Sequence, residues 1–182
     1  MDKDLIEKKI SGEIVFKGTL LEVHKDEVLL PNGAKSHREY IKHNGAVAIL
    51  VFDKDDIYME RQFRYPINEV IYEIPAGKID LGEEELVAAH RELKEETGLT
   101  TDKLIKIGSM YNSVGYSNEV INFYYTNTFK EGETHLDENE FIDVINMPFS
   151  KVLDMVLSGE IKDSKTAYGI MLYDELKKAK KL

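Results

Sequence analysis

The run AVAILVF, residues 46–52, is apolar at every position. A strand with one exposed face alternates apolar and polar residues, so this unbroken run predicts a strand that is buried on both faces. The turn-like DKDD and a second strand, IYMERQ, follow directly, which makes two core strands consecutive in the chain. With 182 residues, the chain is long enough for one sizeable core and a small appendage.

Shorter apolar runs predict the remaining elements. Residues 12–42 contain GEIVF, TLLEV and a PNG turn, which indicate a small antiparallel β-element. Further strands are expected in VIYEIP, LIKIGSMY, VINFYYTNTF and FIDVINM. Helices are expected from about Glu83 to a C-cap at Gly98, in SKVLDMVLSG, and from Ser164 onward. We expect the last helix to direct the following residues toward the core: Ala167, Ile170, Met171 and Leu176.

Composition excludes several kinds of site. The chain has no cysteine, which excludes disulfides, thiolate nucleophiles and Cys-type zinc sites and fits a reducing compartment. It has no apolar run of membrane-spanning length and no signal-like N-terminus, so we expect a cytoplasmic protein that does not associate with membranes. A formal charge of -10 argues against binding nucleic acid over a broad surface.

Only four of the 24 basic residues are arginines: Arg38, Arg61, Arg64 and Arg91. Two of them lie in ERQFRYP, residues 60–66. The rigid donor fork of arginine suits bidentate phosphate binding, although arginines on the exposed face of a strand are common. Both explanations apply to Arg61 and Arg64 at this point.

HRELKEETGL, residues 90–99, places Glu92, Glu95 and Glu96 within little more than one helical turn. Like charges three and four residues apart destabilise an isolated helix. A solvated face is one explanation, because glutamate is a good helix former and each repulsion costs only a few tenths of a kcal/mol. Oxygen ligands for a hard divalent cation are the other explanation. The expected core stripe of this helix uses no glutamate and consists of Leu86, Ala89, Leu93 and Thr97.

The flanking residues favour the metal. GKIDLGEEELVAAHRELKEETGL, residues 77–99, resembles the Nudix box and satisfies every specified position of it: Gly77, Glu83, Arg91-Glu92, Leu93, Glu95-Glu96, Gly98 and Leu99. The resemblance implies an α/β/α sandwich around a mixed β-sheet and hydrolysis of a nucleoside diphosphate derivative. It also implies bound Mg²⁺ or Mn²⁺, which offsets the repulsion among the glutamates, neutralises a diphosphate and activates water.

Around the box, residues from roughly Gly12 to Leu176 are similar to the ADP-ribose pyrophosphatase branch, through LPNGAKSHREYIKHNGAVAIL, ERQFRYPINEVIYEIPAG, DENEFIDV and IKDSKTAYG. The resemblance implies that the Ala76 carbonyl and the Glu92 and Glu96 carboxylates ligate metal. Arg91 would orient a glutamate, most plausibly Glu95, while Arg64 and Arg38 would contact the diphosphate or its ribose side, with Arg61 as a further candidate.

Two more segments carry predicted site residues. In SVGYSNE, residues 113–119, valine stands where the branch usually has proline, but Gly115 and Glu119 match substrate-binding positions. In LDENEF, residues 136–141, the resemblance implies a catalytic glutamate at Glu138 and a further metal ligand at Glu140. Adenine stacks on an N-terminal aromatic residue in related proteins; the candidates are Phe16 and Tyr40, for each of which a place in the core is the simpler expectation.

These observations predict an N-terminal β-element, residues 1–42, that pairs two subunits of a homodimer, and a hydrolase domain, residues 43–182. The predicted reaction is metal-dependent hydrolysis of ADP-ribose to AMP and ribose 5-phosphate. The alternatives are hydrolysis of another nucleoside diphosphate derivative, such as a different sugar nucleotide or an oxidised nucleotide, and a non-catalytic ADP-ribose sensor.

Overall fold

The structure is a computed structural model that describes residues 2–136 and 138–182. The chain folds into two compact units. Residues up to Asn44, together with Tyr111–Glu119, form the first unit; Gly45–Met110 and Val120–Leu182 form the second. The dimerising role expected for residues 1–42 stays a prediction.

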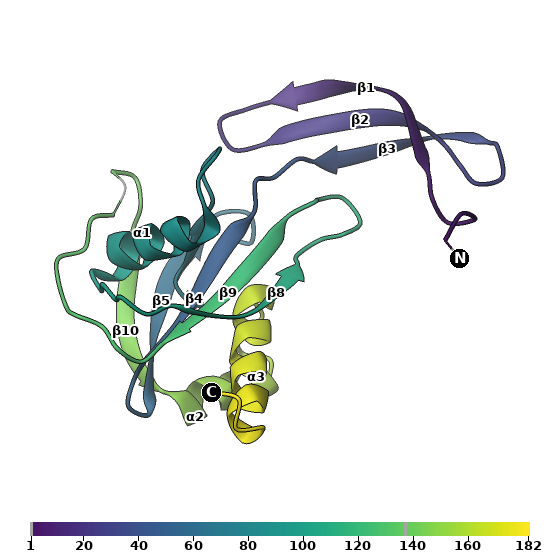
Figure 1. Ribbon diagram of the computed structural model, residues 1–182. Coiled ribbons are helices and arrows are strands. Elements are labelled where there is room, and N and C mark those ends of the chain that lie inside the picture. The colour runs from purple at the N-terminus through teal and green to yellow at the C-terminus, as the bar shows by residue number, and fades with distance from the viewer. Residues whose placement is uncertain (1, 137) are drawn as a thin grey trace. The chain divides into compact units, whose positions relative to one another are not determined.

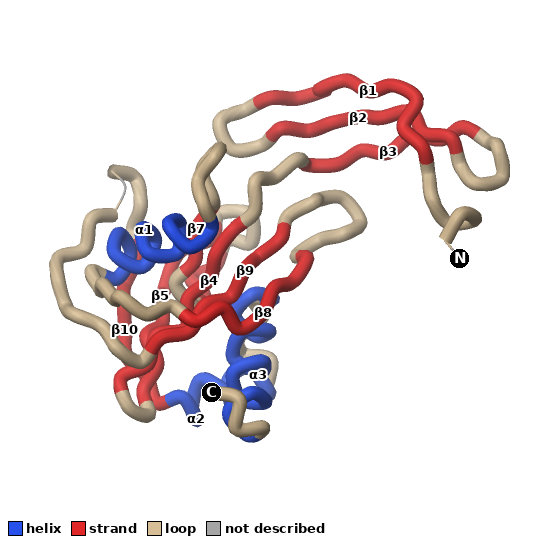
Figure 2. The backbone as a smooth tube through the Cα atoms, in the orientation of Figure 1, coloured by secondary structure: helices blue, strands red, loops and turns tan. Residues whose placement is uncertain are grey.

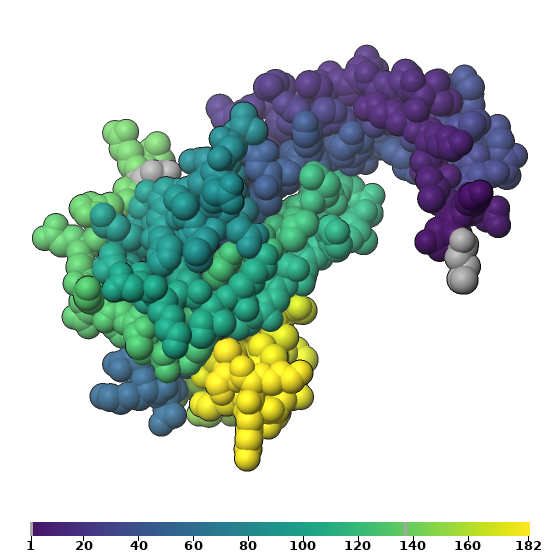
Figure 3. Space-filling model, viewed as in Figure 1, coloured from purple at the N-terminus to yellow at the C-terminus, as the bar shows by residue number. Residues whose placement is uncertain are grey.

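The first unit is built on a three-stranded antiparallel sheet in the order β1-β2-β3. Its strands are β1 (Lys8–Lys17), β2 (Glu22–Leu29) and β3 (Lys35–Ile41). Every residue of β1 is exposed, and its atoms are among the purple ones in Figure 3. Phe16 is 56% exposed, so the expectation that it lies in the core is wrong. Phe16 lies near the end of β1, an edge strand whose residues are all exposed.

The second unit contains a mixed sheet in the order β10-β5-β4-β9-β8 (Figures 1 and 2). The strand β4 pairs in parallel with β9, and β6 and β7 pair antiparallel with β5 and β4. The strands are β4 (Ala46–Asp53), β5 (Asp56–Arg64), β6 (Glu69–Glu73), β7 (Ala76–Lys78), β8 (Ile105–Tyr111), β9 (Val120–Thr126) and β10 (Ile142–Pro148). The helices are α1 (Glu85–Thr97), α2 (Phe149–Leu157) and α3 (Ser164–Lys178).

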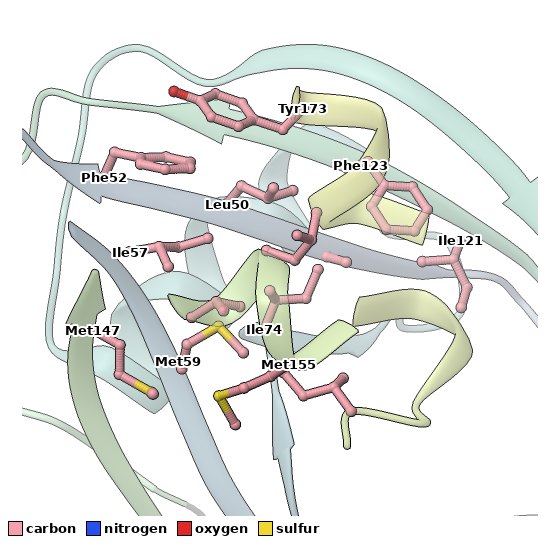
Figure 4. Close-up of a cluster of buried hydrophobic side chains, with 14 of the residues drawn as sticks. Leu50, Phe52, Ile57, Met59, Ile74, Ile121, Phe123, Met147, Met155 and Tyr173 are labelled. Carbon is pink, nitrogen blue, oxygen red and sulfur yellow. The ribbon is translucent and has the colours of Figure 1, made fainter. Parts of the chain in front are cut away.

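As expected, β4 is buried on both faces. Successive side chains of a strand point to opposite faces, and the two faces of β4 pack in two different cores. Leu50 and Phe52 pack in one core with residues of α2 and α3 such as Met155 and Tyr173 (Figure 4). Val47, Ile49 and Val51 pack in a second core with Ala88, Ala89 and Leu93 of α1. Helices therefore cover both faces of the sheet, and the predicted α/β/α sandwich is confirmed.

Two predicted core positions on the helices are wrong. Leu86 is 45% exposed and Met171 is 49% exposed. At the start of α1, Ala88 packs against β4 in the position that was expected for Leu86. In α3 the large buried side chains near Met171 are those of Ile170 and Tyr173, and Tyr173 stacks on Phe52 at 4.1 Å between ring centroids. None of the helices in the described residues has the length and apolar character needed to cross a membrane.

Candidate active site

The turn between β6 and β7 brings a backbone group against α1. Pro75 ends β6, since it has no N–H for a sheet ladder, and β7 then pairs with β4 from Ala76 onward. The Ala76 N–H donates to Glu96 Oε2 at 2.9 Å. Ala76 and Glu96 are twenty residues apart in the chain, yet the fold places them in direct contact.

Glu96 meets a second buried carboxyl group, that of Glu60 on β5. Glu60 is 4% exposed and Glu96 is 5% exposed, and their carboxyl groups interact electrostatically. Burial raises the pKa of both groups, and the charge of Glu60 raises the pKa of Glu96 further. A proton or a bound cation that reduces the combined negative charge of two neighbouring buried carboxyl groups is therefore favoured.

Arg91 connects the other glutamates of α1 to the loop before it. Its guanidinium donates twice to Glu83, from Nε and Nη2 at 2.9 Å each, and once to the Lys78 carbonyl at 3.0 Å. Its Nη1 donates to Glu92 at 2.8 Å and to Glu95 at 3.0 Å. The hydrogen bonds from Arg91 lower the pKa of Glu83 to about 2. The expected contact between Arg91 and Glu95 is present, although Arg91 bonds Glu83 more extensively.

Glu92 lies against the backbone of Gly77. A Cβ atom placed on Gly77 would lie 1.9 Å from the Glu92 carboxyl carbon, so only glycine permits this approach. Burial raises the pKa of Glu92, with smaller contributions from the charges of Glu95 and Glu140. The glycine that opens the box thus makes room for a half-buried carboxylate.

The loop between β9 and β10 contributes Glu140 to this cluster. Glu140 is half-buried, and its charge raises the pKa of Glu60, Glu92 and Glu96 together. Glu138 lies in an exposed turn of the same loop. The charge of Glu140 therefore acts on the buried carboxyl groups, whereas Glu138 lies at the surface.

The two arginines of ERQFRYP have different surroundings. Arg64 makes a bidentate ion pair with buried Glu73, with Nε and Nη2 at 2.6 and 2.7 Å from the carboxylate oxygens. The Arg64 side chain stays 43% exposed, so its remaining donors are accessible to a ligand. Arg61 lies over the Tyr72 ring, 5.6 Å from its centroid, and is 3.5 Å from Asp143.

The remaining predicted substrate contacts belong to the first unit. Arg38 on β3 donates to the His37 carbonyl at 2.9 Å and forms an ion pair with Glu7. Glu119 accepts a hydrogen bond from Asn112 Nδ2 at 2.8 Å. Gly115 has open space where a side chain would begin. The contact of these three residues with substrate stays a prediction.

The model of the NUDIX domain matches residues 42–167. The chain belongs to the Nudix family. The resemblance stated from the box is thereby confirmed, and the match spans the sheet, α1 and the start of α3.

Two relatives with curated names resemble this Nudix chain over nearly its whole length. An ADP-ribose pyrophosphatase of Bacillus subtilis is 44% identical over 97% of this chain and 97% of its own. A methanol dehydrogenase activator of Bacillus methanolicus is 38% identical over 100% of this chain and 99% of its own. A crystal structure titled ADP compounds hydrolase superposes with a TM-score of 0.85 at 22% identity, covering 96% of this chain and 95% of the other, and shows the same fold.

The candidate site contains a residue that the sequence did not reveal. Glu60 was not among the predicted site residues, because a glutamate within IYMERQ looks like an exposed strand position. The antiparallel register pairs it with Glu73, and burial places its carboxyl group on Glu96. Glu60 follows buried Met59 directly, where strict alternation would give an exposed residue, and only the structure reveals this departure from alternation.

The carboxyl cluster fits a hard divalent cation. Glu60 Oε1 is buried and has no hydrogen-bond partner within the described residues, and a bound cation would offset the repulsion between the Glu60 and Glu96 carboxyl groups. In the part of the chain that the structure describes, no three acidic or histidine side chains already surround one cation position. The metal-binding roles therefore stay a proposal.

Proposed function

We propose that this chain hydrolyses the diphosphate bond of ADP-ribose to AMP and ribose 5-phosphate, with Mg²⁺ or Mn²⁺ as cofactor. The observation that carries the proposal is the buried pair Glu60–Glu96 at the Ala76 turn, next to a Nudix box in which every specified residue is present. The name of the relative from Bacillus subtilis supports ADP-ribose as the substrate.

Ala76, Glu92, Glu96 and Glu140 would hold the metal, and Glu60 joins this set because its carboxyl group shares the buried site. When bound, the metal supplies positive charge to the diphosphate and makes water a better nucleophile at neutral pH. Arg91 holds Glu92 and Glu95 in place. Arg64, oriented by Glu73, is suited to bind a phosphate with its free donors.

In the proposed reaction, water adds to one phosphorus atom and the bond from that phosphorus to the bridging oxygen breaks. The proton of the attacking water goes to a carboxylate outside the metal-binding set, for which Glu138 is the predicted residue. Exposure of Glu138 in the present structure is compatible with this role, since catalytic contacts in ligand-free enzymes often form only when substrate binds.

We also propose a homodimer, supported by the exposed apolar residues of β1, which include Ile14, Val15 and Phe16. In this proposal Arg38, Gly115 and Glu119 stay predicted substrate contacts, by resemblance to the ADP-ribose branch. The cytoplasmic location stays a prediction.

Product analysis tests the function directly. The protein is incubated with ADP-ribose and Mg²⁺, and AMP and ribose 5-phosphate are quantified. Glu92→Gln and Glu96→Gln should each lower kcat at least about 100-fold while leaving the fold intact, because each removes a ligand charge but keeps the side-chain shape. Glu175→Gln, at an exposed position of α3, is the matched control. Near-normal turnover of either box variant at saturating Mg²⁺ would contradict the assignment.

A substrate panel separates the alternatives. Faster turnover of another sugar nucleotide or of an oxidised nucleotide would move the assignment to that substrate. A protein that binds ADP-ribose without hydrolysing it would be a sensor. The relative named methanol dehydrogenase activator adds a further candidate, that this chain activates a dehydrogenase, which is tested by adding it to a purified methanol dehydrogenase and measuring the rate.

A further inference from the structure

Residues 73–76, sequence EIPA, connect β6 to β7. Three different elements form hydrogen bonds with the backbone of this segment. The Ile74 N–H donates to Thr166 Oγ1 of α3 at 3.0 Å. The Pro75 carbonyl accepts from the Ile49 N–H of β4 at 2.8 Å. The Ala76 N–H donates to Glu96 of α1 at 2.9 Å. The conformation of the Ala76 turn therefore depends on α3 as well as on the Nudix box.

The hydroxyl group of Thr166 has one donor role and one acceptor role, and its neighbours fix both. Its hydroxyl donates to the Asp163 carboxylate at 2.7 Å, while its own N–H donates to the same Asp163 oxygen, Oδ2, at 3.0 Å, as in a helix N-cap. With its hydrogen committed to Asp163, the Thr166 oxygen accepts from Ile74. Thr166 is fully buried, so water does not replace this bond if the hydroxyl is removed.

Lys165, the preceding residue, binds the same segment through charge. Its ammonium group contacts the Glu73 carboxylate and lies 3.0 Å from Asp163. Glu73 also accepts the two bonds from Arg64, and only 3% of the Glu73 side chain is exposed. Two cations thus face two carboxylates, which permits burial of Glu73 at the end of β6, where an unpaired carboxylate would be strongly destabilising.

We propose that Lys165 and Thr166 are positioning residues for the metal site: the first turn of α3 fixes Glu73 and Ile74, and so holds in place Ala76, whose N–H donates to Glu96. The inference rests on the metal role proposed above for Ala76 and Glu96. Groups that hold metal ligands from behind affect metal affinity strongly, by about 10- to 100-fold when they are lost. The motif IKDSKTAYG, residues 161–169, thereby acquires a function in the site although none of its side chains need touch the metal.

Equilibrium binding of Mn²⁺ to the nucleotide-free protein, measured by the electron paramagnetic resonance signal of free Mn²⁺, tests the proposal. Thr166→Val keeps the side-chain shape but loses both hydroxyl bonds, and it should raise the Mn²⁺ Kd about 10-fold. Thr166→Ser keeps the hydroxyl and should bind Mn²⁺ as the wild type does. This pair distinguishes the hydrogen bond from the volume of the side chain.

Lys165→Met should also raise the Mn²⁺ Kd, and Lys165→Arg should restore most of the affinity. Lys178→Met is the matched control, because Lys178 lies on the same helix and pairs with Asp174 and Glu175 at its far end. Melting temperatures of all variants are measured alongside. Destabilised variants with a Mn²⁺ Kd within twofold of the wild type would overturn the proposal, since they would show that the network serves stability alone.

The same titration separates this inference from the proposed function. A wild-type protein that binds no Mn²⁺ would contradict the metal site itself, and with it the positioning role. A wild type that binds Mn²⁺ with variants that bind equally well would contradict only the role of α3. The measurement needs no substrate, so an error in the choice of ADP-ribose does not affect it.

Discussion

Arg91 shows at the scale of one residue how the glutamate-rich helix is stable. Its five donor groups are distributed among Glu83, Glu92, Glu95 and the Lys78 carbonyl, so one guanidinium offsets the repulsion that the spacing of the glutamates creates. The rigid fork of arginine suits this arrangement, and lysine would supply a single point charge in its place.

The Glu83–Arg91 pair predicts a pH dependence of stability. The pKa of Glu83 is lowered in the folded protein to about 2, from 4.5. The stabilisation is therefore complete above about pH 4.5 and is lost as the pH falls toward 2. Glu83→Gln removes it, so the difference in the free energy of unfolding between wild type and variant should be largest near pH 6 and should shrink at pH 3. Urea unfolding at both pH values measures this, and an equal difference at both would contradict the prediction.

At the scale of elements, the end of α1 is joined to the loop between β9 and β10. Gly98 closes the helix with φ 72°. The two chains are held by backbone bonds in both directions between Thr100 and Lys130, and by a bond from the His135 N–H to the Glu95 carbonyl. The loop that carries Glu138 and Glu140 is thus anchored on the same helix that carries Glu92 and Glu96.

This junction predicts an unusually high cost for a side chain at Gly98. A Cβ atom there would lie 2.7 Å from the Gly132 carbonyl oxygen, in addition to the cost of positive φ. Gly159, which follows α2 with φ 78°, has open space around it and provides the control. Gly159→Ala should cost about 1 kcal/mol of unfolding free energy and Gly98→Ala about 2 kcal/mol or more. Equal costs in thermal or urea unfolding would show that the loop moves away freely.

We predict different roles for the two glutamates of this loop, Glu138 and Glu140. Glu138→Gln should lower kcat about 100-fold with little change in Mg²⁺ affinity, as expected for loss of a general base. Glu140→Gln should raise the Mg²⁺ concentration needed for half-maximal activity, because the negative charge of Glu140 acts on the buried carboxyl groups. Glu133→Gln, in the same loop and exposed, should change neither. Wild-type metal and pH profiles in the first two variants would show that the loop is only a surface segment.

At the scale of the whole molecule, the first unit has an exposed edge strand rich in apolar side chains. Ile10, Ile14, Val15 and Phe16 of β1 are each 46–56% exposed. Unpaired, apolar edge strands favour association, and proteins usually protect them. A second subunit is the cover that we propose.

Size-exclusion chromatography with light scattering at micromolar concentration should therefore give a dimer. Phe16→Asp should shift the protein toward the monomer, because it places a charge on the apolar face of β1. Leu157→Asp changes a residue of similar exposure in α2 and should leave the dimer intact. A fully active wild-type monomer at the same concentration would contradict the prediction.

The sequence by itself determined the double-sided burial of β4, most of the individual strands and helices, and the clustering of glutamates on α1. Continuous apolar runs and local spacing carry this information, since burial on two faces and convergence along one helix are both local properties of the chain. Gly98 as a helix end and the pairing of Arg91 with Glu95 belong to the same class, because each depends on a few neighbouring residues.

Only the tertiary structure decided which distant groups share the site. Glu60 joins Glu96, and Lys165 and Thr166 join Glu73 and Ile74, through strand register and helix packing across as many as 92 residues of chain. The exposure of Leu86 and Phe16 was decided in the same way, by which neighbours cover each face. Periodicity fixes the face on which a residue lies, but the folded arrangement of all elements determines what that face contacts.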